Sequence, residues 1–136
     1  MKYIVLDTNC LLACISNSSN FHSVWMSFLN EEFYLCVSNE IMTEYEEILA
    51  RKTSPTFADI IIHIILNSEN VMFVNPYYKF GLIPTDPDDN KFVDCAIVAN
   101  ADYIVSQDTH FDILKTVYFP KVNVIHIEEF AEELKK

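Results

Sequence analysis

The chain has 136 residues, 51% of them hydrophobic, which is typical of one globular domain with a single core. Nine basic and twenty acidic residues give a net charge of −11, so the basic surface that attracts nucleic acid to many proteins is absent from the composition. Glycine occurs once, at Gly81, which excludes the glycine-rich phosphate loops of Walker-type and dinucleotide-binding proteins. The acidic surplus still allows a local site where metal ions neutralise clustered carboxylates, and it suits a basic partner.

The cysteines indicate a reducing compartment. All four lie in apolar surroundings, and no second pair with zinc-like spacing follows Cys10 and Cys14. We therefore expect buried free thiols. Because the sequence also shows no signal peptide and no apolar run of membrane-spanning length, we expect a cytoplasmic protein.

The first half of the chain alternates strands and helices. Strands are predicted over residues 3–6, 33–37 and 71–74, and helices over 9–15, 21–29, from Ser38 or Asn39 to 49, and from Pro55 to 66. The first strand is continuously apolar and ends directly before Asp7, as expected of a parallel strand covered on both faces. In the third helix Glu44 and Glu46 lie on the two shoulders of the apolar face, and periodicity does not choose between them. The fourth helix is apolar nearly all round at 60–66, so it is deeply buried or covers a partner chain.

Residues 86–108, DPDDNKFVDCAIVANADYIVSQD, carry most of the functional information. Asp88 or Asp89 can cap a helix that is nearly all apolar from 92 to 101. Asp94 is the only charged residue in that run, and a buried carboxylate is costly unless it is paired or bound to metal. Asn100 then stands where a left-handed residue ends a helix.

The rest of the chain completes an alternating pattern. A strand over 103–106 is followed by Asp108, a short helix over 111–117, a strand over 122–127 and a closing helix over 128–134. Five strands alternating with helices predict an α/β fold with a mostly parallel sheet. Ligands of such sheets bind beyond the carboxyl ends of the strands where strand order reverses. If the first and fourth strands are neighbours there, Asp7 and Asp108 meet.

Clustered carboxylates of this kind need compensation. Two of them about 4 Å apart repel by ~1 kcal/mol in water and ~4 kcal/mol at an effective dielectric constant near 20. Oxygen ligands without convergent His or Cys favour Mg²⁺ or Mn²⁺ over zinc. Such ions can activate water for phosphodiester cleavage.

The order of four segments resembles a PIN-domain ribonuclease. These are LDTN after the first strand, SNEIMTEYEEIL, the 86–108 stretch, and a final VNVIHIEEF. Each motif alone is common, but their order and spacing together are specific and cover essentially the whole chain. The chain is most similar to the subfamily of toxin components from toxin–antitoxin pairs. The resemblance implies a single PIN-like domain over 1–136, three-layer α/β/α with a five-stranded sheet.

The resemblance also implies a site. Its four metal-binding, catalytic acids are Asp7, Glu44, Asp94 and Asp108, which selects Glu44 over Glu46. Asn9 and Ser106 occupy positions that in this family hold metal-bound waters, and Asp89 and Asp112 are auxiliary acids. The implied activity is Mg²⁺- or Mn²⁺-dependent endoribonuclease cleavage of RNA, with an antitoxin protein as partner. Relatives often have Thr-Gly-Asp where this chain has residues 106–108, so the backbone there is less free.

Other interpretations fit less well. A haloacid-dehalogenase-type phosphatase needs an acid where Asn9 stands, and a receiver domain needs a Lys after its last strand, where this chain has His126 and Glu128. The alternative from a different class is a catalytically silent PIN-like binding module, and four retained acids argue against it. From the apolar surface of the helices over 21–29 and 55–66 we expect a homodimer.

Overall fold

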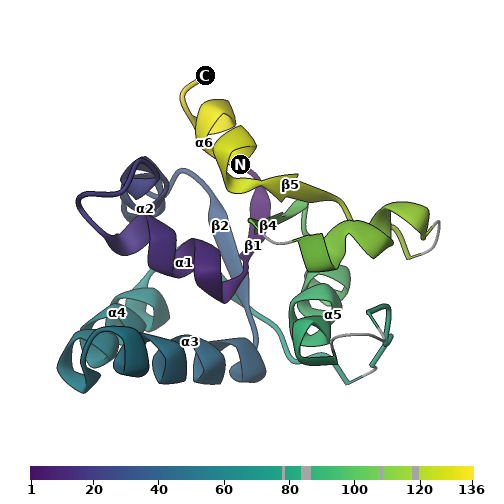
Figure 1. Cartoon of the computed structure of the whole chain (residues 1–136), viewed down its shortest axis with the longest axis horizontal. Helices are drawn as coiled ribbons and strands as arrows, with labels where there is room; N and C mark the ends of the chain where they lie inside the picture. Colours follow the sequence, from purple (N-terminus) through teal and green to yellow (C-terminus); the bar gives the residue numbers. More distant parts are fainter. Residues whose placement is uncertain (78, 84–86, 108, 118–119) are drawn as a thin grey trace.

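The computed structural model describes residues 1–77, 79–83, 87–107, 109–117 and 120–136. Its centre is a five-stranded sheet in the order β3-β2-β1-β4-β5, in which every neighbouring pair is parallel. Helices lie on both sides of the sheet, with α1 and α2 to one side of the strands and α5 to the other in Figure 1. The predicted three-layer α/β fold is confirmed, and the mostly parallel sheet is all parallel.

The elements follow the predicted order. The strands are β1 (Tyr3–Leu6), β2 (Tyr34–Val37), β3 (Val71–Phe73), β4 (Tyr103–Ser106) and β5 (Val124–His126). The α-helices are α1 (Thr8–Ile15), α2 (His22–Leu29), α3 (Asn39–Lys52), α4 (Pro55–Asn67), α5 (Asn90–Ala99) and α6 (Ile127–Leu134). Two 3₁₀ segments complete the chain, η1 (Pro87–Asp89) and η2 (Thr109–Thr116).

Local side-chain chemistry explains several helix boundaries. Ser38 caps α3 by accepting a hydrogen bond from the Ile41 N–H. Ser54, which directly precedes Pro55, caps α4 by accepting a hydrogen bond from the Phe57 N–H. Asn100 ends α5 in the left-handed region at φ 52° and ψ 47°, as predicted. Asp89 occupies the N-cap position of α5, but its side chain makes no capping hydrogen bond. The segment predicted as a short helix at 111–117 is 3₁₀.

The sheet order brings distant segments to one edge. β1 is central, pairing with β2 on one side and β4 on the other, so the carboxyl ends of β1 and β4 are adjacent. The interior residues of β1, β2 and β4 are buried, among them Ile4, Val5, Leu35 and Ile104. Strand order reverses between β1 and β4, which is where a parallel sheet places a ligand. The first and fourth strands are therefore neighbours, which is the condition under which Asp7 and Asp108 were expected to meet.

Helix α4 is less buried than its sequence suggests. Ile61, Ile62 and Ile65 pack inward, whereas Ile60 and Leu66 are each 52% exposed. The sequence leaves open whether this helix is deeply buried or covers a partner chain, and deep burial is wrong for the part of its surface that carries Ile60 and Leu66. None of the helices in the described ranges is long and apolar enough to cross a membrane.

Candidate functional site

Asp7 lies at the carboxyl end of β1 and is fixed by two donors. Its Oδ1 accepts the Cys10 N–H at 2.8 Å, so the side chain also caps α1. Its Oδ2 accepts the hydroxyl of Ser106, the last residue of β4, at 2.6 Å. Both Asp7 and Ser106 are buried. The structure therefore brings together two predicted site residues from neighbouring strand ends.

Glu44 joins this site from α3. The Thr8 hydroxyl, one residue after Asp7, donates a short hydrogen bond to Glu44 Oε2. The Lys91 ammonium lies 3.0 Å from Glu44 Oε1. Both carboxylate oxygens are thus engaged, and the side chain points toward the ends of β1 and α5. Glu44, the acid that the resemblance selects over Glu46, therefore lies beside the residue that follows Asp7.

A buried tyrosine links the same elements through the backbone. The Tyr45 hydroxyl donates a 2.6 Å hydrogen bond to the Leu6 carbonyl. Tyr45 is fully buried, and burial raises the pKa of its hydroxyl well above the usual value, so it remains a neutral donor. Because Tyr45 follows Glu44 and Leu6 precedes Asp7, this bond joins α3 beside Glu44 to the end of β1 beside Asp7.

Asp94 lies on α5 with a different environment. It is 3% exposed, and its Oδ1 accepts the Phe80 N–H at 3.2 Å. Burial raises the pKa of the Asp94 carboxyl above its usual value, partly offset by the Phe80 N–H and the Lys79 charge. Its carboxylate is therefore held by the backbone of the preceding loop.

Asp89 and Asn9 line a pocket with the two acids. This acidic pocket has a volume of about 220 Å³ and is lined by Asp7, Thr8, Asn9, Glu44, Ile48, Lys52, Asp89 and Phe92. Asn9 is exposed, in keeping with a residue that contacts solvent or bound water. Asp89, predicted only as an auxiliary acid, faces the same space as Asp7 and Glu44.

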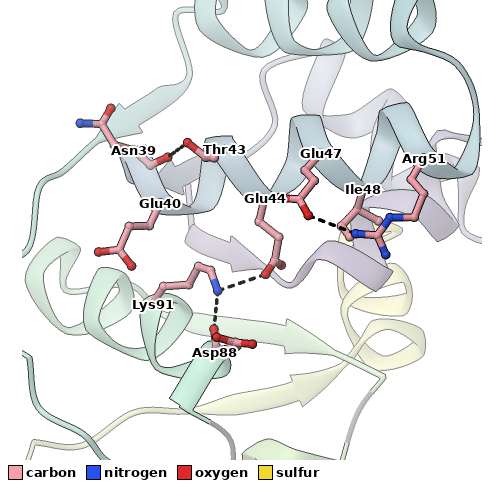
Figure 2. A pocket seen from close by; sticks show the side chains of 9 residues that line it. All are labelled: Asn39, Glu40, Thr43, Glu44, Glu47, Ile48, Arg51, Asp88 and Lys91. Carbon is pink, nitrogen blue, oxygen red and sulfur yellow. Dashed lines mark hydrogen bonds and ion pairs between the residues drawn. The ribbon is translucent and has the colours of Figure 1, made fainter.

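A second hollow adjoins it along α3. This Glu44 groove has a volume of about 570 Å³ and is lined by Asn39, Glu40, Thr43, Glu44, Glu47, Ile48, Arg51, Asp88 and Lys91. Figure 2 shows Lys91 pointing from α5 toward Glu44, with Arg51 farther along α3. Glu44 and Ile48 belong to both hollows, so the two form a continuous surface.

The remaining predicted residues are less closely joined. Asp112 is exposed in η2, 3.5 Å from Lys115, and lines a separate pocket that also includes Ser106. Asp108 and Asp86 lie outside the described residues. Within the described ranges, no three His, Cys, Asp or Glu side chains converge closely enough to hold a metal ion.

Two contributors to the site escape sequence reasoning. Thr8 is part of the LDTN motif without an assigned role, and the sequence does not identify Lys91 as a partner of Glu44, yet both residues contact Glu44 in the structure. A signal for Lys91 exists in the sequence, since it is the one basic residue between Asp88 and Ala101. The four cysteines are free and buried as predicted, and burial raises the thiol pKa of Cys14 and Cys36 to about 12.

A family comparison covers most of the chain. Residues 3–110 match the model of the PIN domain. Comparison with curated protein sequences gives no match.

Solved structures share the fold at low identity. VapBC2 from Rickettsia felis, bound to a DNA fragment from its promoter, is 14% identical with a TM-score of 0.63, covering 91% of this chain and 98% of that chain. DNA-bound VapBC from Salmonella typhimurium is 16% identical with a TM-score of 0.63, covering 93% and 99%. VapC20 from Mycobacterium tuberculosis, a sarcin-ricin loop cleaving toxin, is 14% identical with a TM-score of 0.58, covering 80% and 92%. Such identities establish a common fold and nothing finer.

Proposed function

Because this chain belongs to the PIN-domain family, we propose that it is a metal-dependent endoribonuclease and the toxin of a toxin–antitoxin pair. Its catalytic and metal-binding residues are Asp7, Glu44, Asp94 and Asp108, with Asn9, Ser106, Asp89 and Asp112 as auxiliary residues. The cofactor is Mg²⁺ or Mn²⁺.

The observation that carries the proposal is the connection between Asp7 and Glu44. Thr8, the residue directly after Asp7, donates a hydrogen bond to Glu44. Asp7 and Glu44 both line the acidic pocket at the reversal of strand order. Ser106 brings the end of β4, and so the segment leading to Asp108, against Asp7. A scaffold protein gains nothing from gathering carboxylates that repel one another.

The donor chemistry fits a hard divalent cation. The described pocket offers carboxylate, hydroxyl and amide oxygens, the ligands that Mg²⁺ and Mn²⁺ prefer. Cys10 is adjacent, but burial and then the Asp7 charge raise the pKa of its thiol far above neutrality, so thiolate ligation is disfavoured. Asp7 and Glu44 line this pocket and would hold the ion; the proposal adds Asp94, which accepts the Phe80 N–H outside the lining of the pocket.

The chain's own residues would orient the acids and contact the RNA backbone. A bound cation would supply an activated water and stabilise the leaving oxygen of the phosphodiester. Ser106 and the Cys10 N–H fix Asp7, and Thr8 fixes Glu44, so the acids are oriented before substrate arrives. Lys52 and Arg51, at the walls of the acidic pocket and the Glu44 groove, provide positive charge for the RNA backbone.

The partner assignments rest on the comparisons and on charge. The VapBC structures named above are complexes, and we propose a basic antitoxin protein as partner for this chain of net charge −11. We also propose a homodimer, supported by the exposed side chains of Ile60 and Leu66 on α4. A monomeric mass in light scattering across micromolar concentrations, unchanged on dilution, contradicts the dimer.

The function is tested by incubating the protein with structured and unstructured RNAs in Mg²⁺ or Mn²⁺. We expect cleavage products with a 3′-hydroxyl and a 5′-phosphate, and loss of activity in chelator and in Asp7→Asn. Products ending in 2′,3′-cyclic phosphate, or full activity in chelator, contradict the proposal. A silent binding module shows no cleavage and no Mn²⁺-linked stabilisation.

A further inference from the structure

Lys91 forms the most sheltered ion pair in the described part of the chain. The Lys91 side chain is 14% exposed and that of Glu44 is 28%. The Lys79–Glu40 and Arg51–Glu47 pairs, which also use acids of α3, exceed half exposure at both partners. Exposed pairs are screened by water and salt, while partly buried pairs are screened much less. The attraction between Lys91 and Glu44 is therefore less screened than that within the other described ion pairs.

The ammonium is held in place by more than Glu44. Lys91 also donates to the Asp88 carbonyl, and its Nζ lies 5.5 Å from the centroid of the neighbouring Phe92 ring. Figure 2 shows both polar contacts of the ammonium, on the side of Glu44 that faces α5. A cation thus already contacts a carboxylate to which we have assigned a divalent ion.

We propose that Lys91 is the internal counter-ion of the carboxylate site, occupying Glu44 until a divalent cation displaces it and thereby lowering metal affinity. The inference rests on the proposed metal site. Thr8 donates to Glu44 Oε2 and Lys91 contacts Oε1, so a metal ion that binds Glu44 shares a carboxylate oxygen with one of these donors and weakens its contact. A neighbouring ammonium also repels the incoming ion directly.

A competing role and a purely structural role for Lys91 predict opposite changes in Mn²⁺ affinity when Lys91 is removed. If Lys91 only stabilised the fold, removing it would loosen Glu44 and weaken metal binding. If Lys91 competes with the metal, removing it strengthens binding. The direction of the change in Mn²⁺ affinity therefore separates the two.

The test is Mn²⁺ titration followed by electron paramagnetic resonance, which counts free Mn²⁺ without needing activity. We expect Lys91→Met to bind Mn²⁺ on the order of tenfold more tightly than the wild type, and Lys91→Arg to stay close to the wild type. Lys135→Met, which removes the same charge from an exposed pair with Glu132, is the matched control and should leave affinity unchanged. Lys91→Gln keeps a polar head group and is the second variant to use if Lys91→Met folds poorly. It should also bind Mn²⁺ more tightly than the wild type.

A Glu44→Gln background completes the test: competition for the Glu44 carboxylate is absent there and only the direct repulsion by Lys91 remains, so the effect of Lys91→Met should be smaller. Unchanged or weaker Mn²⁺ affinity in Lys91→Met and Lys91→Gln, or no Mn²⁺ binding by any variant, overturns the inference. Metal-dependent RNA cleavage with unchanged affinity leaves the proposed function standing and removes only the role of Lys91. Tighter Mn²⁺ binding by the Lys91 variants without any RNA cleavage supports the role of Lys91 and contradicts the proposed endoribonuclease function.

Discussion

Ser106 Oγ lies 2.6 Å from Asp7 Oδ2, so the last residue of β4 donates to the first residue after β1. Both side chains are buried. A hydroxyl donating to a carboxylate in such surroundings is a charge-assisted bond that orients the acid and ties the two strand ends together.

Ser106→Ala should therefore destabilise the protein. Removing the hydroxyl takes a donor from a buried carboxylate, and hydrogen bonds to charged groups contribute about 1.5–3 kcal/mol. We expect a loss of that order in the free energy of unfolding, measured by urea denaturation at neutral pH. Ser18→Ala, at an exposed hydroxyl bonded to Ser16, is the matched control and should change stability little. Equal stability of wild type and Ser106→Ala contradicts the prediction.

Tyr45→Phe should both destabilise the fold and weaken metal binding. The ring keeps its packing, but the Leu6 carbonyl loses its 2.6 Å donor, at a cost of about 1–2 kcal/mol. Because that bond joins the residues next to Glu44 and Asp7, we also expect lower Mn²⁺ affinity by calorimetry. Tyr34→Phe, at a tyrosine stacked on Tyr3 away from the site, is the comparison. Destabilisation with unchanged Mn²⁺ affinity would mean that Tyr45 stabilises the core but does not affect metal binding.

The thiols should resist modification in the native state. All four cysteines are buried, and burial raises the pKa of each thiol, to about 12 for Cys14 and Cys36. At pH 8 almost no thiolate is present to react. We expect slow reaction with an aromatic disulfide reagent in buffer and rapid reaction of four thiols per chain in denaturant. Fast modification of the native protein contradicts this.

The sequence predicts the fold well because its signals are local and agree with each other. Continuous apolar strands such as 3–6 indicate a sheet covered on both faces, and Asn100 marks the end of α5 at the residue where the structure turns left-handed. The exposed half of α4 is different. Ile60 and Leu66 satisfy the pattern of a buried helix, and composition contains no information about whether another chain covers them.

The site is predictable to the level of strand ends but not of side-chain partners. Asp7 and Glu44 follow from motif order, and the structure places both in one pocket. Their donors, Thr8, Ser106 and Lys91, depend on which rotamers meet across elements far apart in sequence. For the same reason the sequence leaves open whether a metal or an internal partner compensates Asp94, and the structure shows its Oδ1 accepting the Phe80 N–H.

Asp94→Asn gives the last prediction, on stability and pH. Burial raises the folded-state pKa of Asp94, so the native state holds its proton more tightly than the unfolded chain, whose carboxyl titrates near ~3.9. Ionisation therefore costs stability: the wild type loses free energy of unfolding as pH rises through the window between these two pKa values. Asn stays neutral and its oxygen can still accept the Phe80 N–H. In chelator, Asp94→Asn should be the more stable protein at pH 7, and the difference should disappear toward pH 4.

Metal should reverse that order if Asp94 is a ligand, because only the wild type then gains the full binding free energy of the ion. Asp89→Asn is the paired variant, since Asp89 lines the acidic pocket in this structure while Asp94 is held by the loop. Urea denaturation of both variants with chelator and with saturating Mn²⁺ distinguishes the two acids. A Mn²⁺-linked stabilisation lost in Asp94→Asn and kept in Asp89→Asn supports Asp94 as the ligand. The opposite pattern assigns the metal to Asp89 and leaves Asp94 as a buried acid bound to the backbone. An Asp94→Asn protein that is less stable than the wild type in chelator contradicts the predicted cost of ionisation.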